Sequence, residues 1–464
     1  MGARYTRDLA AAASMLHRLR DDPEDMELLR DLQRFLVRQI AREERTATRL
    51  KMAARRLKVC LSRDRLPRER ARRVKERITV FGELQDDLRH RTVNWRFFGD
   101  GIASIYQSTH ALKHLYYDAD YRPKEVAGFL TGKRGFRREW KLLNWGISMG
   151  VPVVLSDLTN IVRHGDICAL GGADPVPVEV KSSSNRNSRT ARQDQQRQAI
   201  AEFYANDGAA FFRGMANVRR VEIRDARYSH VDALNHCMHD SVIEGFATIS
   251  PEPGLRYVAI SDLTLRDRIG AYATRATLAR QLTPTENWLP CYPFTLTMST
   301  ANQLRFILGD TAVVVLMDLW HVKALYEQRG VHATAVMDGV SSFQICTDPA
   351  DLDGGVVRIS EVFFARVALE FQSLTWFVDE TVRLFHRTVE EMAAIEATGA
   401  NVPTMVIPTD WFNLRDCYDV EQYEEVLRRA LPMRLTGVES RRAEQFAFAP
   451  GGFGPITVPN EPIN

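Results

Sequence analysis

Two carboxylates and a lysine lie close together in a stretch whose apolar residues are typical of two strands. Asp166 belongs to the run NIVRHGDICAL, and Glu179 and Lys181 belong to the next run, PVPVEVKSS. Because alternate residues of a strand share a face, we expect Glu179 and Lys181 on one side of the second strand. Carboxylates bind Mg²⁺, and the bound cation activates water for attack on a phosphodiester. The pattern therefore predicts metal-dependent phosphodiester hydrolysis, with Mg²⁺ or Mn²⁺ as the cofactor.

Asp166 together with Glu179-Val180-Lys181 resembles the motif of the PD-(D/E)XK nuclease superfamily, which has the restriction-endonuclease-like fold. The resemblance implies that Asp166 and Glu179 bind the metal and that Lys181 positions or activates the water. It also implies a further acidic ligand on the helix that precedes the strands. In this chain Glu139 is the residue that fits.

The order of expected elements around the motif matches the superfamily over residues 136–262. The helix FRREWKLLNWGISMG comes first and is followed by the strand VPVVL at 151–155. The strand with the aspartate and the strand with Glu-x-Lys come next, and a second helix begins near Arg192. This order predicts an α/β fold with a restriction-endonuclease-like mixed sheet.

The same spelling occurs a second time in the chain. Asp120 is followed by Glu139-Trp140-Lys141, but the apolar residues of this segment recur at helical spacing. We therefore interpret the segment as the first helix of the fold and not as a catalytic strand. Glu139 keeps two interpretations, an accessory metal ligand or a solvated surface residue beside its basic neighbours.

Gln196 is the candidate on the second helix. It shares a stripe with Ile200 and Phe203, and several members of the superfamily place a glutamine there with a tyrosine four residues later. Here Tyr204 follows at eight residues, so the match is partial. Gln196 is either a site residue or a surface amide of the helix.

The loop from Ser182 to Arg192 contains the polar and basic side chains that contact phosphates. We favour substrate contact over a solvated loop, because its three arginines follow the motif directly. These residues are Arg186, Arg189 and Arg192.

The basic residues of the chain are concentrated near the N-terminus. Residues 49–77 contain 13 Lys and Arg against 3 Asp and Glu, although the whole chain has a formal charge of only +3. Such a block favours a phosphate backbone, DNA before RNA, over an acidic protein partner. The expected contacts include Arg55, Arg56, Arg70 and Arg73.

Long helical patterns on both sides of Pro67 predict an antiparallel hairpin in the first hundred residues. With 464 residues the chain should form two or three domains. We expect a basic helical hairpin at 1–115, the nuclease-like core at 116–265, an α+β domain at 266–439 and a tail rich in Gly and Pro at 440–464.

In the α+β domain the segments FTLTMS and SSFQICT have the pattern of strands. Apolar residues at every third or fourth position from Phe363 to Met392 predict one long amphipathic helix. This stripe and the seam of the hairpin offer more apolar surface than the expected domains require. We therefore expect a homodimer or a stable heteromeric complex.

Six well-separated cysteines without a CxxC pair predict neither disulfides nor a zinc ribbon. The N-terminal residues do not have the pattern of a secretory signal, and we find no apolar stretch long enough for a membrane span. We expect a cytoplasmic protein that does not bind membranes.

These observations predict a metal-dependent endonuclease with a helical arm that grips nucleic acid. By analogy with the superfamily, its pathway would be restriction, defence against phage or DNA repair. The alternative is a non-catalytic subunit that keeps the nuclease fold for binding or assembly.

Overall fold

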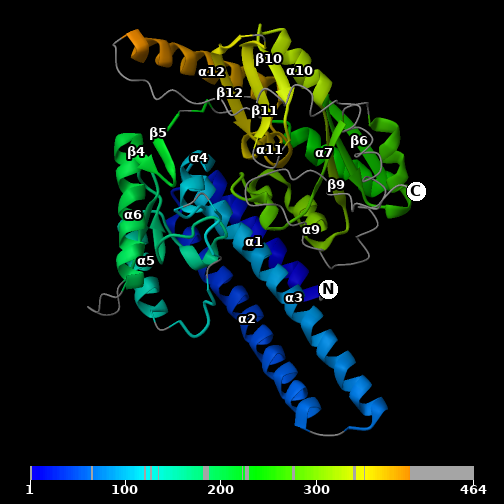
Figure 1. Cartoon of the computed structure of the whole chain (residues 1–464). Helices are drawn as coiled ribbons and strands as arrows, with labels where there is room; N and C mark the ends of the chain where they lie inside the picture. The colour runs from blue at the N-terminus through cyan, green and yellow to red at the C-terminus, as the bar shows by residue number, and fades with distance from the viewer. Residues whose placement is uncertain are drawn as a thin grey trace. The chain divides into compact units, whose positions relative to one another are not determined.

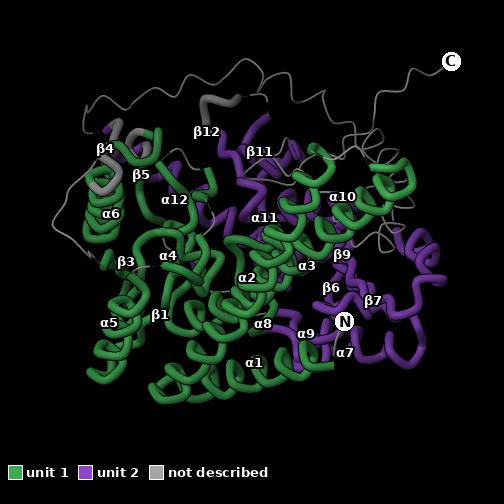
Figure 2. Tube along the Cα trace, turned by 90° about the horizontal axis from the view of Figure 1, so that it is seen from below, with its two compact units in different colours: residues 1–221, 284–296 green, residues 222–283, 297–464 purple. Residues whose placement is uncertain are grey.

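The computed structural model describes residues 3–63, 66–119, 122–125, 128–133, 135–180, 188–221, 223–224, 229–273, 277–337, 341–349 and 351–397. The chain combines helices with small antiparallel sheets, which confirms the predicted mixture of helix and sheet. It divides into unit 1, residues 1–221 and 284–296, and unit 2, residues 222–283 and 297–464 (Figure 2). The expected boundaries at 115 and 265 fall inside these units, and the expected tail lies outside the described residues.

Unit 1 begins with three helices, α1 (Ala3–Asp21), α2 (Met26–Arg63) and α3 (Arg68–Tyr106). Figure 1 shows α2 and α3 side by side over most of their length, as the hairpin prediction requires. At the base of the hairpin Trp95 is fully buried, and its ring packs edge-on against Tyr5. Most side chains of 49–63 and 68–80 are exposed or half-buried, and we call these two segments the arm.

The base of the hairpin is joined to the first sheet by hydrogen bonds and close packing. The buried amide of Gln33 donates to Val153 O at 2.8 Å and accepts from Leu155 N at 3.0 Å. A Cβ at Gly99 would lie 1.9 Å from Leu158 O. Only glycine at this position therefore allows the backbone of α3 to lie so close to the backbone of Leu158. The hairpin and the predicted core therefore form one unit.

The first sheet has the order β1-β2-β3 and is antiparallel. The elements of this part are α4 (Thr109–Leu112), η1 (Lys113–Leu115), α5 (Phe136–Ser148), β1 (Val153–Leu155), η2 (Ser156–Leu158), β2 (Ile167–Ala169), β3 (Val176–Val178) and α6 (Ser188–Asn206). A hairpin of β4 (Gly208–Phe212) and β5 (Met215–Arg219) follows. The predicted helix, strand and second helix around the motif are confirmed as α5, β1 and α6.

Unit 2 contains two further sheets, of order β6-β7-β9-β8 and β10-β11-β12. Its strands are β6 (Phe246–Glu252), β7 (Leu255–Ile260), β8 (Thr277–Leu282), β9 (Ala312–Asp318), β10 (His332–Ala335), β11 (Ser341–Asp348) and β12 (Asp351–Ser360). Its helices are α7 (Val231–Glu244), η3 (Leu263–Tyr272), α9 (Thr300–Leu308), α10 (Leu319–Glu327), α11 (Glu361–Leu369) and α12 (Leu374–Ala397). The short elements η4 (Glu286–Trp288) and α8 (Phe294–Thr297) follow β8 in the sequence, but residues 284–296 belong to unit 1. SSFQICT is confirmed as a strand, β11.

Two predictions in this half are wrong. FTLTMS contains a short helix, α8, and not a strand. The apolar stripe from 363 to 392 is divided between α11 and α12, because Phe371 has a left-handed backbone with φ of 57°. The hydroxyl of Ser373 then accepts a hydrogen bond from Trp376 N at 3.2 Å, which caps the second helix.

Among the helices of the described residues, none combines the length and the apolar character that a bilayer span requires.

Candidate active site

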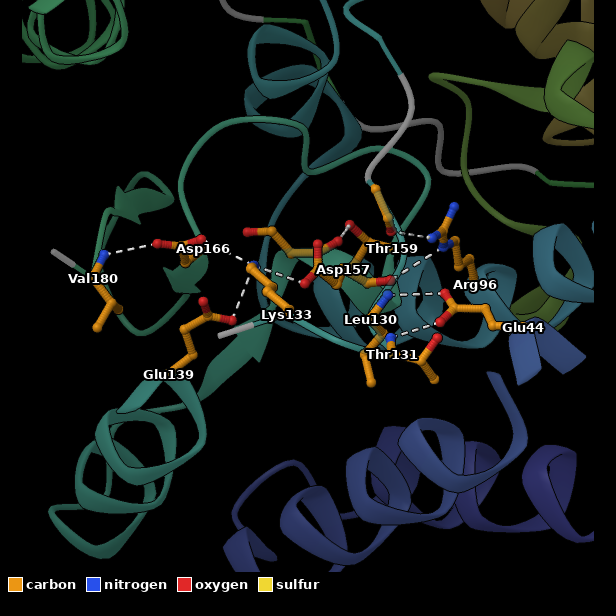
Figure 3. A network of polar contacts seen from close by, with 12 residues as sticks. Glu44, Arg96, Leu130, Thr131, Lys133, Glu139, Asp157, Thr159, Asp166 and Val180 are labelled. Atoms are coloured by element: carbon orange, nitrogen blue, oxygen red, sulfur yellow. Dashed lines mark hydrogen bonds and ion pairs between the residues drawn. The ribbon is translucent and has the colours of Figure 1, made fainter. Parts of the chain in front are cut away.

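Acidic side chains gather around the ammonium group of Lys133. Its Nζ lies 2.8 Å from Asp157 Oδ2, 3.0 Å from Asp166 Oδ1 and 3.0 Å from Glu139 Oε2. Glu139 comes from the first turn of α5, Asp157 from η2, and Asp166 from the residue before β2. Figure 3 shows the three carboxylates directed toward Lys133. A fourth acidic side chain, Glu179, lies beside Asp166, and the hydrogen bond between the two requires a proton on one of them.

The register of the sheet brings Asp166 and Glu179 together. Ile167 is paired with Val178, and the residues one step beyond this pair are Asp166 and Glu179. The backbone N–H of Asp166 donates to Val178 O at 2.9 Å, so the pairing continues past the strand ends. Asp166 Oδ2 accepts a hydrogen bond from Val180 N at 2.9 Å, which fixes the orientation of the carboxylate.

Two glycines leave room for the acidic groups. Gly165 has a φ of +76°, and a Cβ there would lie 2.8 Å from Val178 N, so a side chain would push the two strands apart. A Cβ at Gly135 would lie 2.7 Å from Glu139 Oε1. The absence of a side chain at Gly135 therefore lets Glu139 fold back toward Lys133.

Glu139 is buried, with 1% of its surface exposed, although Arg137 and Arg138 beside it are both exposed. The alternative interpretation of Glu139 as a solvated surface residue is therefore wrong. Burial raises the pKa of Glu139, and its hydrogen bond with Lys133 opposes this shift. A buried carboxylate whose pKa is shifted by burial and by a charged partner marks a candidate functional site, although structural ion pairs share this property.

The charges at this site are strongly coupled. Burial raises the pKa of Glu179, and the nearby Asp166 carboxylate raises it further. Burial alone would lower the pKa of Lys133, but the attraction of Asp157 and Asp166 outweighs burial and raises it. Lys133 is therefore a permanent cation at neutral pH, and it faces more negative charge than it can neutralise.

Buried residues from α2 and α3 hold the backbone that carries Lys133. Glu44, from α2, accepts hydrogen bonds from Leu130 N at 3.0 Å and Thr131 N at 2.7 Å. Arg96, from α3, donates to Gly128 O at 3.3 Å and to Asp157 O at 3.1 Å. The long helices of the hairpin thus position the residues of the site, as Figure 3 shows.

The carboxylates have the chemistry of a site for a hard divalent cation. Glu139, Asp157 and Asp166 already share one cation, the Lys133 ammonium, and Glu179 lies beside them. Mg²⁺ and Mn²⁺ prefer such oxygen ligands. In the described part of the chain, no three His, Cys, Asp or Glu side chains stand ready to hold a metal as they are arranged.

The remaining predicted residues are spread over several elements. Lys181 and Arg186 lie outside the described residues, as does the side chain of Arg189. Arg192 is exposed on α6, and Gln196 lies on the same helix, where the hydrogen bonds of the acidic cluster do not include it. On the arm, the four predicted contact residues are exposed: Arg55, Arg56, Arg70 and Arg73.

Lys133 and Asp157 were missed by the sequence analysis. Asp157 follows β1 by two residues, in the segment VVLSDL, and a polar residue at the end of an apolar strand was a usable signal. Lys133 gave no such signal, because it lies in the irregular stretch TGKRG. Its role depends on contacts with residues 24 and 33 positions away in the chain.

In comparisons with known proteins, neither a family model, nor a curated protein, nor a solved structure matches the chain.

Proposed function

We propose that unit 1 is a metal-dependent nuclease with a restriction-endonuclease-like core, and that DNA is its favoured substrate. One observation carries this proposal: Glu139, Asp157 and Asp166 all lie within 3.0 Å of one cationic atom, with Glu179 beside Asp166. Four acidic side chains, from a helix, a 3₁₀ helix and the ends of two strands, would be costly to gather without a cation to bind. The helix, three strands and helix from α5 to α6 also have the order that the superfamily resemblance implies.

Asp166 and Glu179 would hold the metal, with Glu139 and Asp157 completing the acidic shell. When bound, the cation supplies Lewis-acid chemistry, because it polarises the phosphoryl oxygen and lowers the pKa of bound water. The Val180 N–H keeps Asp166 oriented, so that its second oxygen remains directed into the site. Glu139 excludes water on its side, since only 2% of its side chain is exposed.

Nucleic acid would be gripped by the arm. Its predicted contact arginines are exposed, and the segment 49–77 has a large excess of basic over acidic residues. Arginine side chains on an exposed helix follow a phosphate backbone without reading its sequence. An acidic protein surface is the alternative occupant, and binding measurements with DNA distinguish the two.

A cleavage assay tests the proposed activity. The full chain is incubated with plasmid, linear duplex, single-stranded DNA and RNA, with Mg²⁺, Mn²⁺ or EDTA. Cleavage should require the metal and should be abolished in Asp166→Ala, Glu179→Ala and Lys181→Ala. Lys141→Ala is the matched control, because Lys141 is exposed on α5 close to Glu139 in sequence and belongs to the second copy of the motif spelling. Metal-independent cleavage, or full activity in Glu179→Ala, would contradict the assignment.

A second candidate is a non-catalytic nucleic-acid-binding subunit. The contacts of Lys133 favour it, since an ammonium paired with three carboxylates can also serve as a purely structural ion cluster. This candidate predicts DNA binding by the arm, no cleavage with any metal, and no effect of Mn²⁺ on the acidic cluster.

A further inference from the structure

We propose that Lys133 is a resident counter-cation of the acidic site, and that a divalent metal binds by displacing its ammonium group. The inference rests on the proposed function, because it concerns the metal that the nuclease requires. In this proposal the Lys133 ammonium competes with the metal for the same carboxylates. The affinity for the metal then depends on Lys133 as well as on the carboxylates that would bind the metal.

The contacts of the ammonium group support displacement over joint binding. A lysine ammonium has three N–H donors, and Lys133 has three carboxylate partners within 3.0 Å. Lys133 donates hydrogen bonds to Asp157 and Asp166 and forms an ion pair with Glu139 at 3.0 Å. A metal that binds these oxygens must take the ammonium's place, because two cations cannot share the same small space.

Exposure indicates which member of the cluster can leave. The side chain of Lys133 is 27% exposed, whereas those of Glu139, Asp157 and Asp166 are 2%, 11% and 19% exposed. The ammonium can thus reach solvent without opening the core. The carboxylates stay where α5, η2 and the sheet hold them.

The backbone around Lys133 is anchored, so only the side chain needs to move. Glu44 holds the N–H groups of Leu130 and Thr131, and Arg96 holds the carbonyl of Gly128. Lysine has a flexible stem of four carbons, which can swing away while these contacts remain. Displacement is therefore a local side-chain rotation with no change of fold.

The charge balance supplies the driving force. One ammonium faces three carboxylates directly, and Glu179 adds a fourth acidic group beside Asp166. A divalent cation neutralises two of these charges where Lys133 neutralises one. Exchange of the ammonium for Mg²⁺ or Mn²⁺ consequently lowers the repulsion within the cluster.

Mn²⁺ titration of the full chain tests this inference without any activity measurement. Free Mn²⁺ is followed by electron paramagnetic resonance for the wild type, Lys133→Gln and Lys133→Arg, with Lys141→Gln as the exposed control. Lys133→Gln should bind Mn²⁺ about tenfold more tightly than the wild type, which corresponds to roughly 1.4 kcal/mol. Lys133→Arg should bind it more weakly, because a guanidinium holds carboxylates through a fork of donors. Lys141→Gln should match the wild type.

The outcomes separate this inference from the proposed function. Saturable binding with the same affinity in the wild type and both Lys133 variants would overturn the displacement and leave the metal site standing. A lack of Mn²⁺ binding in all four proteins would overturn both. If Lys133→Gln does not fold, Lys133→Arg decides alone, since it retains the positive charge: weaker binding supports displacement, and unchanged or tighter binding refutes it.

Discussion

Asp166 accepts a hydrogen bond from the backbone of Val180, 14 residues later, across the pair of strands β2 and β3. One carboxylate oxygen is used in this contact and the other faces Lys133. The hydrogen bond from Val180 thus fixes the orientation of the Asp166 carboxylate. Glu139 and Asp157 contact Lys133 from other elements, and the effect of substituting each of them can be measured.

Asp157 should matter for cleavage as much as Glu139 does, although no motif includes it. Both side chains contact Lys133 within 3.0 Å from different elements, η2 and α5. Asp157→Asn and Glu139→Gln should each lower kcat/KM by roughly 10- to 100-fold, the usual effect of residues that tune a metal site. Steady-state kinetics with Mg²⁺ provide the measurement. Wild-type rates in Asp157→Asn, with circular dichroism unchanged, would remove Asp157 from the site.

The stability of the protein should depend on the ionisation of Asp100. This buried carboxyl accepts hydrogen bonds from Asn160 and Ile161, yet burial raises its pKa from 3.8 to about 6. An acid with a raised pKa in the folded state contributes stability below pH 3.8, and that contribution is lost as the pH rises through about 6. Between pH 4 and pH 7 the wild type should therefore lose roughly 2 kcal/mol relative to Asp100→Asn, at about 1.36 kcal/mol per pKa unit.

Urea unfolding of both proteins in EDTA, at several pH values, measures this difference. Only the change with pH is compared, because the substitution also alters the hydrogen bonds to Asn160. Parallel stability curves for the two proteins would show that the proton on Asp100 has no influence.

Reversal of charge on the arm should weaken DNA binding irrespective of sequence. For every phosphate that the variant no longer binds, the slope of log K against log salt should fall by about 0.9. The fold should persist, since the four arginines are exposed. Fluorescence anisotropy at several salt concentrations measures both effects for the double variants Arg55→Glu/Arg56→Glu and Arg70→Glu/Arg73→Glu.

Arg4→Glu/Arg7→Glu is the matched control for these variants. Arg4 and Arg7 have exposed side chains on α1, so the control changes the net charge equally outside the arm. A similar loss of affinity in the control would mean that total charge, and not the arm, governs binding.

Self-association should depend on the arm and not on the C-terminal apolar stripe. In the stripe, Val367, Val378 and Phe385 are buried within unit 2, so this surface is core. On the arm and just beyond it, apolar side chains between 41% and 48% exposed remain: Met52, Val59, Val80 and Leu84. Light scattering at micromolar concentration should give a mass above the 52.8 kDa of one chain.

Val59→Lys/Val80→Lys should reduce that mass toward the monomer. An active wild-type monomer under the same conditions would refute the expected self-association.

The local periodicity of the sequence was sufficient to predict α5, β1 and α6, because each has its own apolar pattern. The prediction of a strand at FTLTMS was wrong, because tertiary contacts override the alternating pattern of this segment. Phe294 packs on Phe97, and Thr295 Oγ1 donates to Phe97 O at 3.0 Å, which holds this segment as a short helix against α3.

The acidic residues of the candidate site were partly predictable and its cation was not. Asp166 and Glu179 were predicted from the superfamily motif, in two segments with the pattern of strands. Lys133 owes its position to Glu44 and Arg96, which lie 87 and 32 residues from the loop atoms that they hold. Contacts over such separations leave no periodic pattern in the sequence.

The length of α2 sets the distance between the acidic site and the tip of the arm. Glu44 supports the loop of the acidic site, and the helix continues for 19 residues to its end at Arg63. At about 1.5 Å per residue this is about 29 Å. Successive phosphates of one DNA strand are about 3.4 Å apart, so the tip of the arm would meet the backbone roughly eight nucleotides from the point of cleavage. The distance between the acidic site and the tip of the arm would therefore set a minimum length of DNA for the proposed nuclease. A duplex shorter than this distance would contact either the acidic site or the tip of the arm, but not both.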